Sequence, residues 1–273
     1  MQLSASRTSP HLWATALRRF GVFWFTCVAI GQIGFICFIV AFYGPRTASG
    51  NYQAWNDKAL IDGHKPGDDI GNFMFATHVL LAAVMTFGGL MQLVPAIRNR
   101  YRALHRWNGR VFLALACFLA IGGLWLGWVR GTRLSIESGL AVSLNGLLIL
   151  CCAVPTILYA MRRKIRQHER WAMRTFMVAS GVWFFRVGIM GWILVNQSPR
   201  WMNSTLSGPA DMTLAIGSYM IPLLGLELYY SAQKSISNVY RTIAFGVLLL
   251  LTGFMIIGIA GTMLIMWPGD LFG

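Results

Sequence analysis

The sequence predicts an all-α integral membrane protein, a bundle of seven transmembrane helices that forms a single membrane domain over residues 1–273. Two observations predict this fold class. Of the 273 residues, 56% are hydrophobic and only 12% are charged, whereas soluble domains carry roughly 25% charged residues. The apolar residues also gather in runs of about 20 or more, the length that crosses a bilayer. The short stretches between the runs leave no room for a separate soluble domain.

The first apolar run follows a basic N-terminal segment, residues 1–20, which resembles the start of a signal peptide. The run is too long for a signal peptide and lacks a clear cleavage site, so we expect it to stay as the first span. Six further runs meet the length criterion. The seven predicted spans are Gly21–Tyr43, Phe73–Ile97, Gly109–Val129, Gly139–Met161, Trp171–Val195, Met212–Ala232 and Thr242–Met266.

Lysine and arginine residues indicate how the spans are threaded. Most of them flank one end of the spans, chiefly in the loops that contain Arg98–Arg110 and Arg162–Arg174. The positive-inside rule then places the N-terminus in the cytoplasm and the C-terminus outside, in a plasma or bacterial inner membrane. The longest loop, residues 44–72, lies outside on this topology. Its aspartates surround His64 with a spacing that fits no metal template, so we interpret it as a solvated acidic loop.

Two basic loops share a motif. Val94–Ile97 and Val154–Ile157 both read V-P-x-I, and each is followed by R-W-x-x-R-x-F, at Arg106–Phe112 and Arg170–Phe176. We interpret this as the duplication of a two-span hairpin, spans 2–3 and spans 4–5, which gives a duplicated four-helix core over residues 73–195. The alternative is that tryptophan and arginine make such loops alike because both anchor at the membrane interface.

Lipid makes polar side chains within predicted spans costly unless they face the protein interior. Among those in the spans, the candidates for a functional site are His78, Gln92, Asn145, Arg186 and Glu227. His78 and Gln92 share one helix stripe because fourteen residues separate them. Glu227 is the only acid within a predicted span, so we expect it to form an ion pair with Arg186. That pair is either a structural strut or part of a proton or ligand site.

Two further histidines, His105 and His168, each precede the R-W of the repeated motif, and we expect them at equal depth. Equal depth is what a b-type haem with two imidazole ligands, or a shared metal, requires. The alternative is that each histidine caps or hydrogen-bonds the start of a helix. The neighbouring arginines would receive haem propionates, anionic lipid headgroups or an anionic substrate. These arginines are Arg102, Arg106, Arg110, Arg170 and Arg174.

Other function classes are disfavoured by the composition. The five cysteines all lie in apolar segments without a C-x-x-C pair, so we expect neither a structural disulfide nor a zinc site. The net charge of +14 comes from residues beside spans, which points to anionic lipid rather than nucleic acid as the partner. We find no hydrolase constellation and no phosphate-binding glycine loop. Whether the protein is an enzyme stays open.

The run from His78 through Gln92 to His105, with the later His168 and Arg186, resembles the bacterial membrane family called domain of unknown function 2306. The resemblance covers about spans two to five. It implies a multi-pass membrane protein with these five residues as its polar signature, and it implies no established activity. A looser similarity links the chain to b561-type cytochromes, but the chain lacks two histidine pairs at two membrane depths.

Three functions are compatible with these residues. In the first, a haem- or quinone-associated electron-transfer protein, His105 and His168 hold one haem or metal, and His78, Asn145 and Gln92 line a quinone or proton site. The second is a carrier or sensor for a small anion or lipid, with the basic loops as its gate. The third is a structural or assembly subunit of a larger membrane complex.

Overall fold

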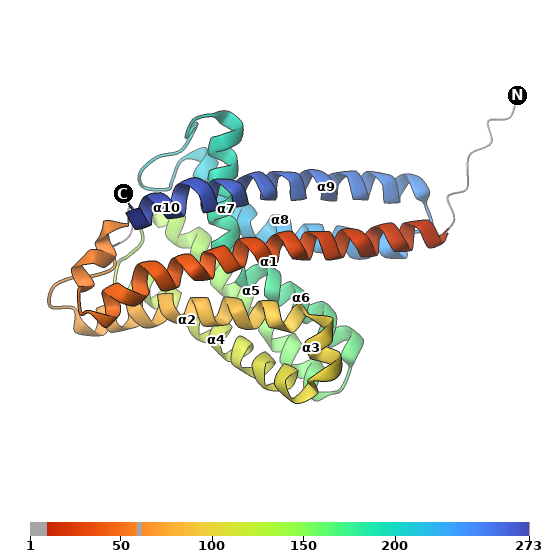
Figure 1. Ribbon diagram of the computed structural model, residues 1–273, viewed down its shortest axis with the longest axis horizontal. Coiled ribbons are helices and arrows are strands. Elements are labelled where there is room, and N and C mark those ends of the chain that lie inside the picture. The colour runs from red at the N-terminus through yellow and green to blue at the C-terminus, as the bar shows by residue number, and fades with distance from the viewer. Residues whose placement is uncertain (1–9, 59–61, 273) are drawn as a thin grey trace, which may run out of the picture.

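The computed structural model describes residues 10–58 and 62–272, and every regular element in this part of the chain is helical. The fold class predicted from the sequence is therefore confirmed at the level of an all-α chain with several helices able to cross a membrane (Figure 1). The helices are α1 (Pro10–Ala48), η1 (Tyr52–Asp57), α2 (Asp69–Leu93), α3 (Pro95–Arg100), α4 (Arg102–Trp128), α5 (Ile136–Met161), α6 (Ile165–Ala179), α7 (Gly181–Asn196), α8 (Pro209–Lys234), α9 (Asn238–Gly261), η2 (Thr262–Met266) and α10 (Trp267–Phe272).

Six spans in the described chain are long and apolar enough to cross a bilayer, and the number becomes seven when α6 and α7 count as one broken span. The sequence predicted a continuous helix from Trp171 to Val195. The structure divides it at Ser180, where the two helices meet at 53°. A Ser-Gly pair is a common place for such a kink, because it weakens the hydrogen-bond ladder of the helix.

The helices form two halves (Figure 1). In one half α2 packs along α4, and α5 packs along both α4 and α6; in the other half α7 packs against α8 and α9. Helix α1 contacts both halves, and they diverge toward the end of the molecule that carries α3. We call this end the basic face because it carries Arg98, Arg100 and Arg166, and the opposite end, with Asp68 and Arg130, the loop face.

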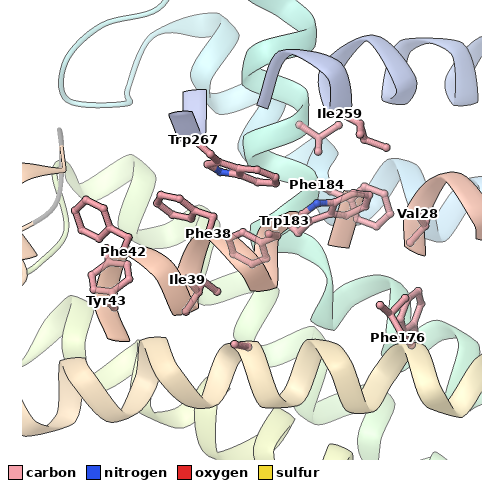
Figure 2. Packing of buried hydrophobic residues seen from close by; sticks show 14 of the residues in the cluster. Val28, Phe38, Ile39, Phe42, Tyr43, Phe176, Trp183, Phe184, Ile259 and Trp267 are labelled. Carbon is pink, nitrogen blue, oxygen red and sulfur yellow. The ribbon is translucent and has the colours of Figure 1, made fainter. Parts of the chain in front are cut away.

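Aromatic side chains fill the core where α1, α7, α9 and α10 meet (Figure 2). Phe38 stacks on Trp267 with ring centroids 5.8 Å apart, and Trp183 packs on Phe184 at 4.7 Å. Lipid tails are as apolar as these side chains, so close packing rather than escape from water holds membrane helices together. Gly258 shows how close the packing is, because a Cβ at this position would lie 2.1 Å from the Val187 carbonyl oxygen.

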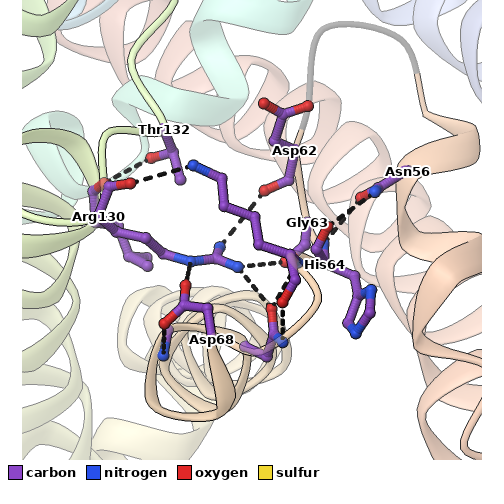
Figure 3. A network of polar contacts seen from close by, with 11 residues as sticks. Asn56, Asp62, Gly63, His64, Asp68, Arg130 and Thr132 are labelled. Carbon is purple, nitrogen blue, oxygen red and sulfur yellow. Dashed lines mark hydrogen bonds and ion pairs between the residues drawn. The ribbon is translucent and has the colours of Figure 1, made fainter.

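Arg130 ties the long loop to the helices at the loop face (Figure 3). Its side chain is only 1% exposed and donates from Nε to Asp68 Oδ2 at 2.8 Å. Its Nη2 donates to Gly63 O at 3.0 Å and to Asn72 Oδ1 at 2.7 Å. The Arg130 guanidinium and the Gly71 N–H hold the pKa of Asp68 below its usual value. This part of the acidic loop is therefore a structural clasp rather than a freely solvated segment.

A second contact joins the loop to the end of the chain. Lys58, which follows η1, forms an ion pair with Asp270 on α10, and both side chains are largely buried. Burial lowers the pKa of Lys58, although its contact with Asp270 opposes that shift. The Lys58 ammonium also lies 4.9 Å from the centre of the Phe38 ring on α1. The loop face is thus closed by two charged contacts, one to Arg130 just beyond the end of α4 and one to Asp270 on α10.

Candidate functional site

A large cavity of about 920 Å³ lies between the two halves of the molecule. Most of its lining is apolar and comes from every long helix, for example Trp24 on α1 and Val187 on α7. The charged residues and the histidines of the lining are concentrated at the basic face, together with one amide at the end of α2. They are Gln92, Arg98, His105, Arg106, Arg110, His168 and Glu169, whereas the other polar lining residues, among them Thr213, Ser218 and Thr252, carry hydroxyl groups. The cavity therefore has a polar head and an apolar body.

His168 is held in one orientation by helix α5. Its Nδ1 lies 3.0 Å from the Thr156 carbonyl oxygen. A carbonyl only accepts, so Nδ1 carries the proton in this hydrogen bond, and a neutral ring then has its lone pair on Nε2. Thr156 also joins α5 to α6 through its hydroxyl, which lies 2.9 Å from the Thr175 hydroxyl. The position of His168 is thus fixed by two neighbouring contacts, and its Nε2 remains available for a ligand.

His105 lines the same cavity from the first turn of α4. Its carbonyl oxygen accepts a hydrogen bond from Gln92 Nε2 on α2 at 3.1 Å. A second hydrogen bond joins the same two helices in the opposite direction, because Asn108 Nδ2 on α4 donates to Gly88 O on α2 at 2.8 Å. The ring Nδ1 of His105 is buried and has no partner in the described chain. Gln92 therefore positions the start of α4, and His105 keeps an unused ring nitrogen.

The five arginines expected to contact an anionic group do not all gather here. Arg106 and Arg110 line the cavity, whereas Arg102, Arg170 and Arg174 do not. A sixth arginine that the sequence analysis did not single out, Arg98, does line it. Its Nη1 lies 3.2 Å from Glu169 Oε1 and links α3 to α6 across the polar end of the cavity.

The predicted ion pair between Arg186 and Glu227 is wrong. Glu227 Oε1 instead lies 2.7 Å from Arg174 Nε. Arg186 donates to the Val182 carbonyl oxygen at 3.1 Å, and its guanidinium lies 5.3 Å from the centre of the Phe35 ring. The break at Ser180 explains the difference, because depth counted along a straight fifth span does not describe a helix that bends by 53°.

His78, Asn145 and Gln92, which the sequence analysis grouped in one quinone or proton site, lie in three different places. Gln92 lines the large cavity. Asn145 lines a second, smaller cavity beside the break between α6 and α7. His78 lines neither cavity: its ring packs between α2 and α4 against Gly122 and Gly123, and its Nδ1 has no partner in the described chain.

The sequence analysis missed several polar residues that shape these sites. Thr156 orients His168 through a backbone carbonyl, which no side-chain pattern reveals. Gln32 and Tyr219 are almost fully buried in apolar helices, with exposed fractions of 0% and 1%. Their place within predicted spans was a usable signal, because buried polar groups in lipid need partners. Among residues 10–58 and 62–272, no three His, Cys, Asp or Glu side chains are arranged to hold a metal ion.

Comparison with known protein families identifies one family to which the chain is similar. The model of a family described as "Predicted membrane protein (DUF2306)" matches residues 75–221. The chain belongs to this family. The match runs from α2 into α8 and includes His105 and His168, while α1 and α9 lie outside it. No curated protein and no solved structure matches the chain. The family description gives a membrane location and no activity.

Proposed function

We propose that the protein binds an isoprenoid quinone in the large cavity and so takes part in membrane electron transfer. The observation that carries the proposal is the shape and chemistry of the cavity, an apolar body of about 920 Å³ with two histidines at one end. A prenyl tail matches the apolar body, and a quinone ring matches the polar end. Ligand pockets of this kind combine a largely apolar wall with a few placed polar groups.

The two histidines supply complementary hydrogen bonds for such a ring. With Nδ1 bound to the Thr156 carbonyl, His168 presents Nε2 as an acceptor for a quinol hydroxyl. His105 lines the same cavity, and we assign the one N–H of its neutral imidazole as the donor for a quinone carbonyl. Arg98 is paired with Glu169, so the remaining positive charge at this end comes from Arg106 and Arg110.

A b-type haem is the second candidate for the same cavity. The histidines that ligate metals usually donate their other ring N–H to a carbonyl or carboxylate, as His168 does to Thr156. His105 lines the same cavity and would serve as the second ligand. Arg106 and Arg110 would face the propionates. The haem would supply one-electron transfer, and the protein would orient it through the two imidazoles.

We also propose that the repeated motif reflects a duplicated hairpin, which would place the two histidines at equivalent positions of the cavity lining. His105 and His168 are each the fourth residue of their helices, α4 and α6. In both copies the second arginine stacks on the tryptophan, Arg110 over Trp107 at 4.8 Å and Arg174 over Trp171 at 4.7 Å. The copies differ at the proline, since Pro95 begins α3 whereas its counterpart lies inside α5.

We also propose that the basic face is cytoplasmic, with the C-terminus outside, in the inner or plasma membrane of a bacterial cell. Arginines gather at α3 and at the starts of α4 and α6, which supports this orientation by the positive-inside rule. Anionic lipid headgroups are the expected neighbours of these side chains. A cysteine introduced at Arg166 and labelled with a membrane-impermeant reagent tests the orientation, because labelling from outside intact cells would reverse it.

The experiment for the quinone uses purified protein in lipid nanodiscs and a short-tailed quinone, with quenching of tryptophan fluorescence as the readout. We expect His168→Leu to weaken binding about tenfold, since a lost hydrogen bond to a ligand is worth roughly 1.5 kcal/mol. His64→Leu is the matched control, because His64 lies in the loop at the opposite face.

Equal affinity in the wild type and in His168→Leu would contradict the proposal. Two further outcomes replace it. An absorbance band of haem in the purified wild type that disappears in His105→Leu and His168→Leu identifies haem as the occupant. Recovery of a tightly bound anionic phospholipid instead of a quinone favours a lipid carrier or sensor.

A further inference from the structure

The last two helical segments of the described chain depart from the regular path of α9. A π-helical turn, η2, precedes α10. Such a turn has i→i+5 hydrogen bonds, so it shifts the register of the residues that follow, and it occurs frequently at functional sites. Trp267 and Asp270 on α10 are three residues apart and lie on one side of this helix. Trp267 stacks on Phe38 of α1 with ring centroids 5.8 Å apart, so this side faces the core (Figure 2).

Asp270 faces two cations from separate elements of the fold. It forms an ion pair with Lys58, in which the side chains of Lys58 and Asp270 are 7% and 18% exposed. Asp270 also interacts electrostatically with Arg186 on α7 and with Tyr43 on α1, and Tyr43 is itself buried. A single carboxylate thus serves as the counter-ion of Lys58 and of Arg186.

Arg186 lacks an acid partner of its own. Among residues 10–58 and 62–272, no carboxylate oxygen lies within 4.0 Å of its guanidinium nitrogens, because the ion pairs there all engage other cations. Arg186 donates to the Val182 carbonyl oxygen of its own helix and lies over the Phe35 ring. A guanidinium has five N–H donors, so others remain for a further acceptor. A cation within a membrane span is normally paired, and an unpaired one indicates a functional site.

We propose that Arg186, Lys58 and Tyr43 form an anion site beneath the loop face and that α10 is its lid, with Asp270 as an internal carboxylate in the place of the ligand. When α10 lifts at the π-helical turn, a small carboxylate takes the position of Asp270. The ligand is a carboxylate because the group that it replaces is one, and it is small because closely packed aromatic rings surround the site. Neither Arg186 nor Lys58 lines the large cavity, so this site is separate from the proposed quinone site.

Thermal unfolding of the protein in nanodiscs tests the site with acetate as the probe. Asp270→Ala removes the internal carboxylate and leaves space for acetate. We expect this variant to unfold at a lower midpoint than the wild type, because two buried cations lose their counter-ion. Acetate should raise the midpoint of the variant, because a ligand that binds only the folded state stabilises it. Acetamide, a neutral molecule of nearly equal size, should leave it unchanged, with ionic strength held constant by sodium chloride.

Arg186→Gln in the Asp270→Ala background shows whether Arg186 contacts the ligand. We expect this double variant to bind acetate about tenfold more weakly than Asp270→Ala does, because a charge-assisted hydrogen bond to the ligand is lost. The double variant should fold, since it also removes an uncompensated cation. Arg133→Gln in the same background is the matched control: Arg133 is exposed and lines only the second cavity, so its loss should leave the acetate affinity unchanged.

Hydrogen–deuterium exchange tests the lid in the wild-type protein. Acetate at high concentration competes with Asp270 for the two cations and should release α10. Backbone amides of residues 267–272 should therefore exchange faster in acetate than in acetamide, while those of α5 should exchange equally in both.

Three results would overturn the proposal. A midpoint of Asp270→Ala that does not respond to acetate would show that the vacated position binds no anion. Equal acetate affinity with and without Arg186→Gln would show that acetate binds elsewhere. Exchange of residues 267–272 in the wild type that acetate leaves unchanged would show that α10 is fixed and is no lid. This last measurement decides the matter alone if Asp270→Ala fails to fold.

Discussion

Replacement of Arg130 by leucine should release the long loop from the helices at the loop face. The guanidinium is almost completely buried and donates two hydrogen bonds from Nη2, to Gly63 O at 3.0 Å and to Asn72 Oδ1 at 2.7 Å. A hydrogen bond that involves a charged group contributes about 1.5–3 kcal/mol. Water will replace part of the loss once the loop opens, so we expect the free energy of unfolding to fall by about 3 kcal/mol.

Hydrogen–deuterium exchange measures this effect where it arises. A loss of about 3 kcal/mol corresponds to a more than hundredfold increase in the population of the open loop. Backbone amides of residues 62–72 should therefore exchange faster in Arg130→Leu, while those of α9 change little. The midpoint of thermal unfolding should also fall, by roughly 6–12 °C on the scale of globular chains of this size.

Arg133→Leu is the matched control for this experiment. Arg133 lies three residues away and carries the same charge, but it is exposed and donates a single hydrogen bond, to Gly127 O at 3.0 Å. We expect its loss to cost less than about 1 kcal/mol, as for other exposed charged contacts. Equal exchange in Arg130→Leu and Arg133→Leu would refute the conclusion that the Arg130 network holds the loop.

Two further predictions concern packing and pH. Gly258→Ala should destabilise the protein by about 1–3 kcal/mol, because the new Cβ would meet the Val187 carbonyl oxygen. Gly253→Ala is the control, since a Cβ there has open space and should be neutral or slightly stabilising. Thermal unfolding distinguishes the two variants, and equal midpoints would be inconsistent with the tight contact at Gly258. Arg130 lowers the pKa of Asp68 in the folded protein. The ionised carboxylate therefore stabilises the fold above the unfolded pKa of about 4. This contribution disappears as the pH falls through the lowered pKa of the folded state. In Asp68→Asn the midpoint should depend less steeply on pH between about 5 and 3; an unchanged slope would remove Asp68 as the cause.

The spans, and the placement of both histidines at the same end of the helix bundle, could be predicted from the sequence for physical reasons. Lipid excludes charged side chains from long stretches, so composition alone reveals the helices. The repeated motif placed His105 and His168 at matching positions, and the structure brings both to one cavity. The positions of the spans can be read from hydrophobicity because the cost of placing a side chain in lipid depends on that residue and not on its partners.

Partner choice could not be predicted in the same way. Glu227 pairs with Arg174 rather than Arg186, because the bend at Ser180 changes which parts of the fifth span face α8. The orientation of His168 depends on a backbone carbonyl, that of Thr156, which every residue possesses. Such contacts depend on helix rotation and bending, and hydrophobic periodicity does not determine either quantity at the precision that a hydrogen bond requires.

The length of α1 gives the membrane itself a way to influence the large cavity. Its 39 residues measure about 58 Å at 1.5 Å per residue, nearly twice the hydrocarbon thickness of about 30 Å. Near the basic face Leu17 packs with Ala232 and Ala244, while farther along α1 packs on α2 of the other half. A helix this long adjusts its inclination when lipid chains become shorter or longer. Because it is attached to both halves, that adjustment would be transmitted as a change in the separation between them.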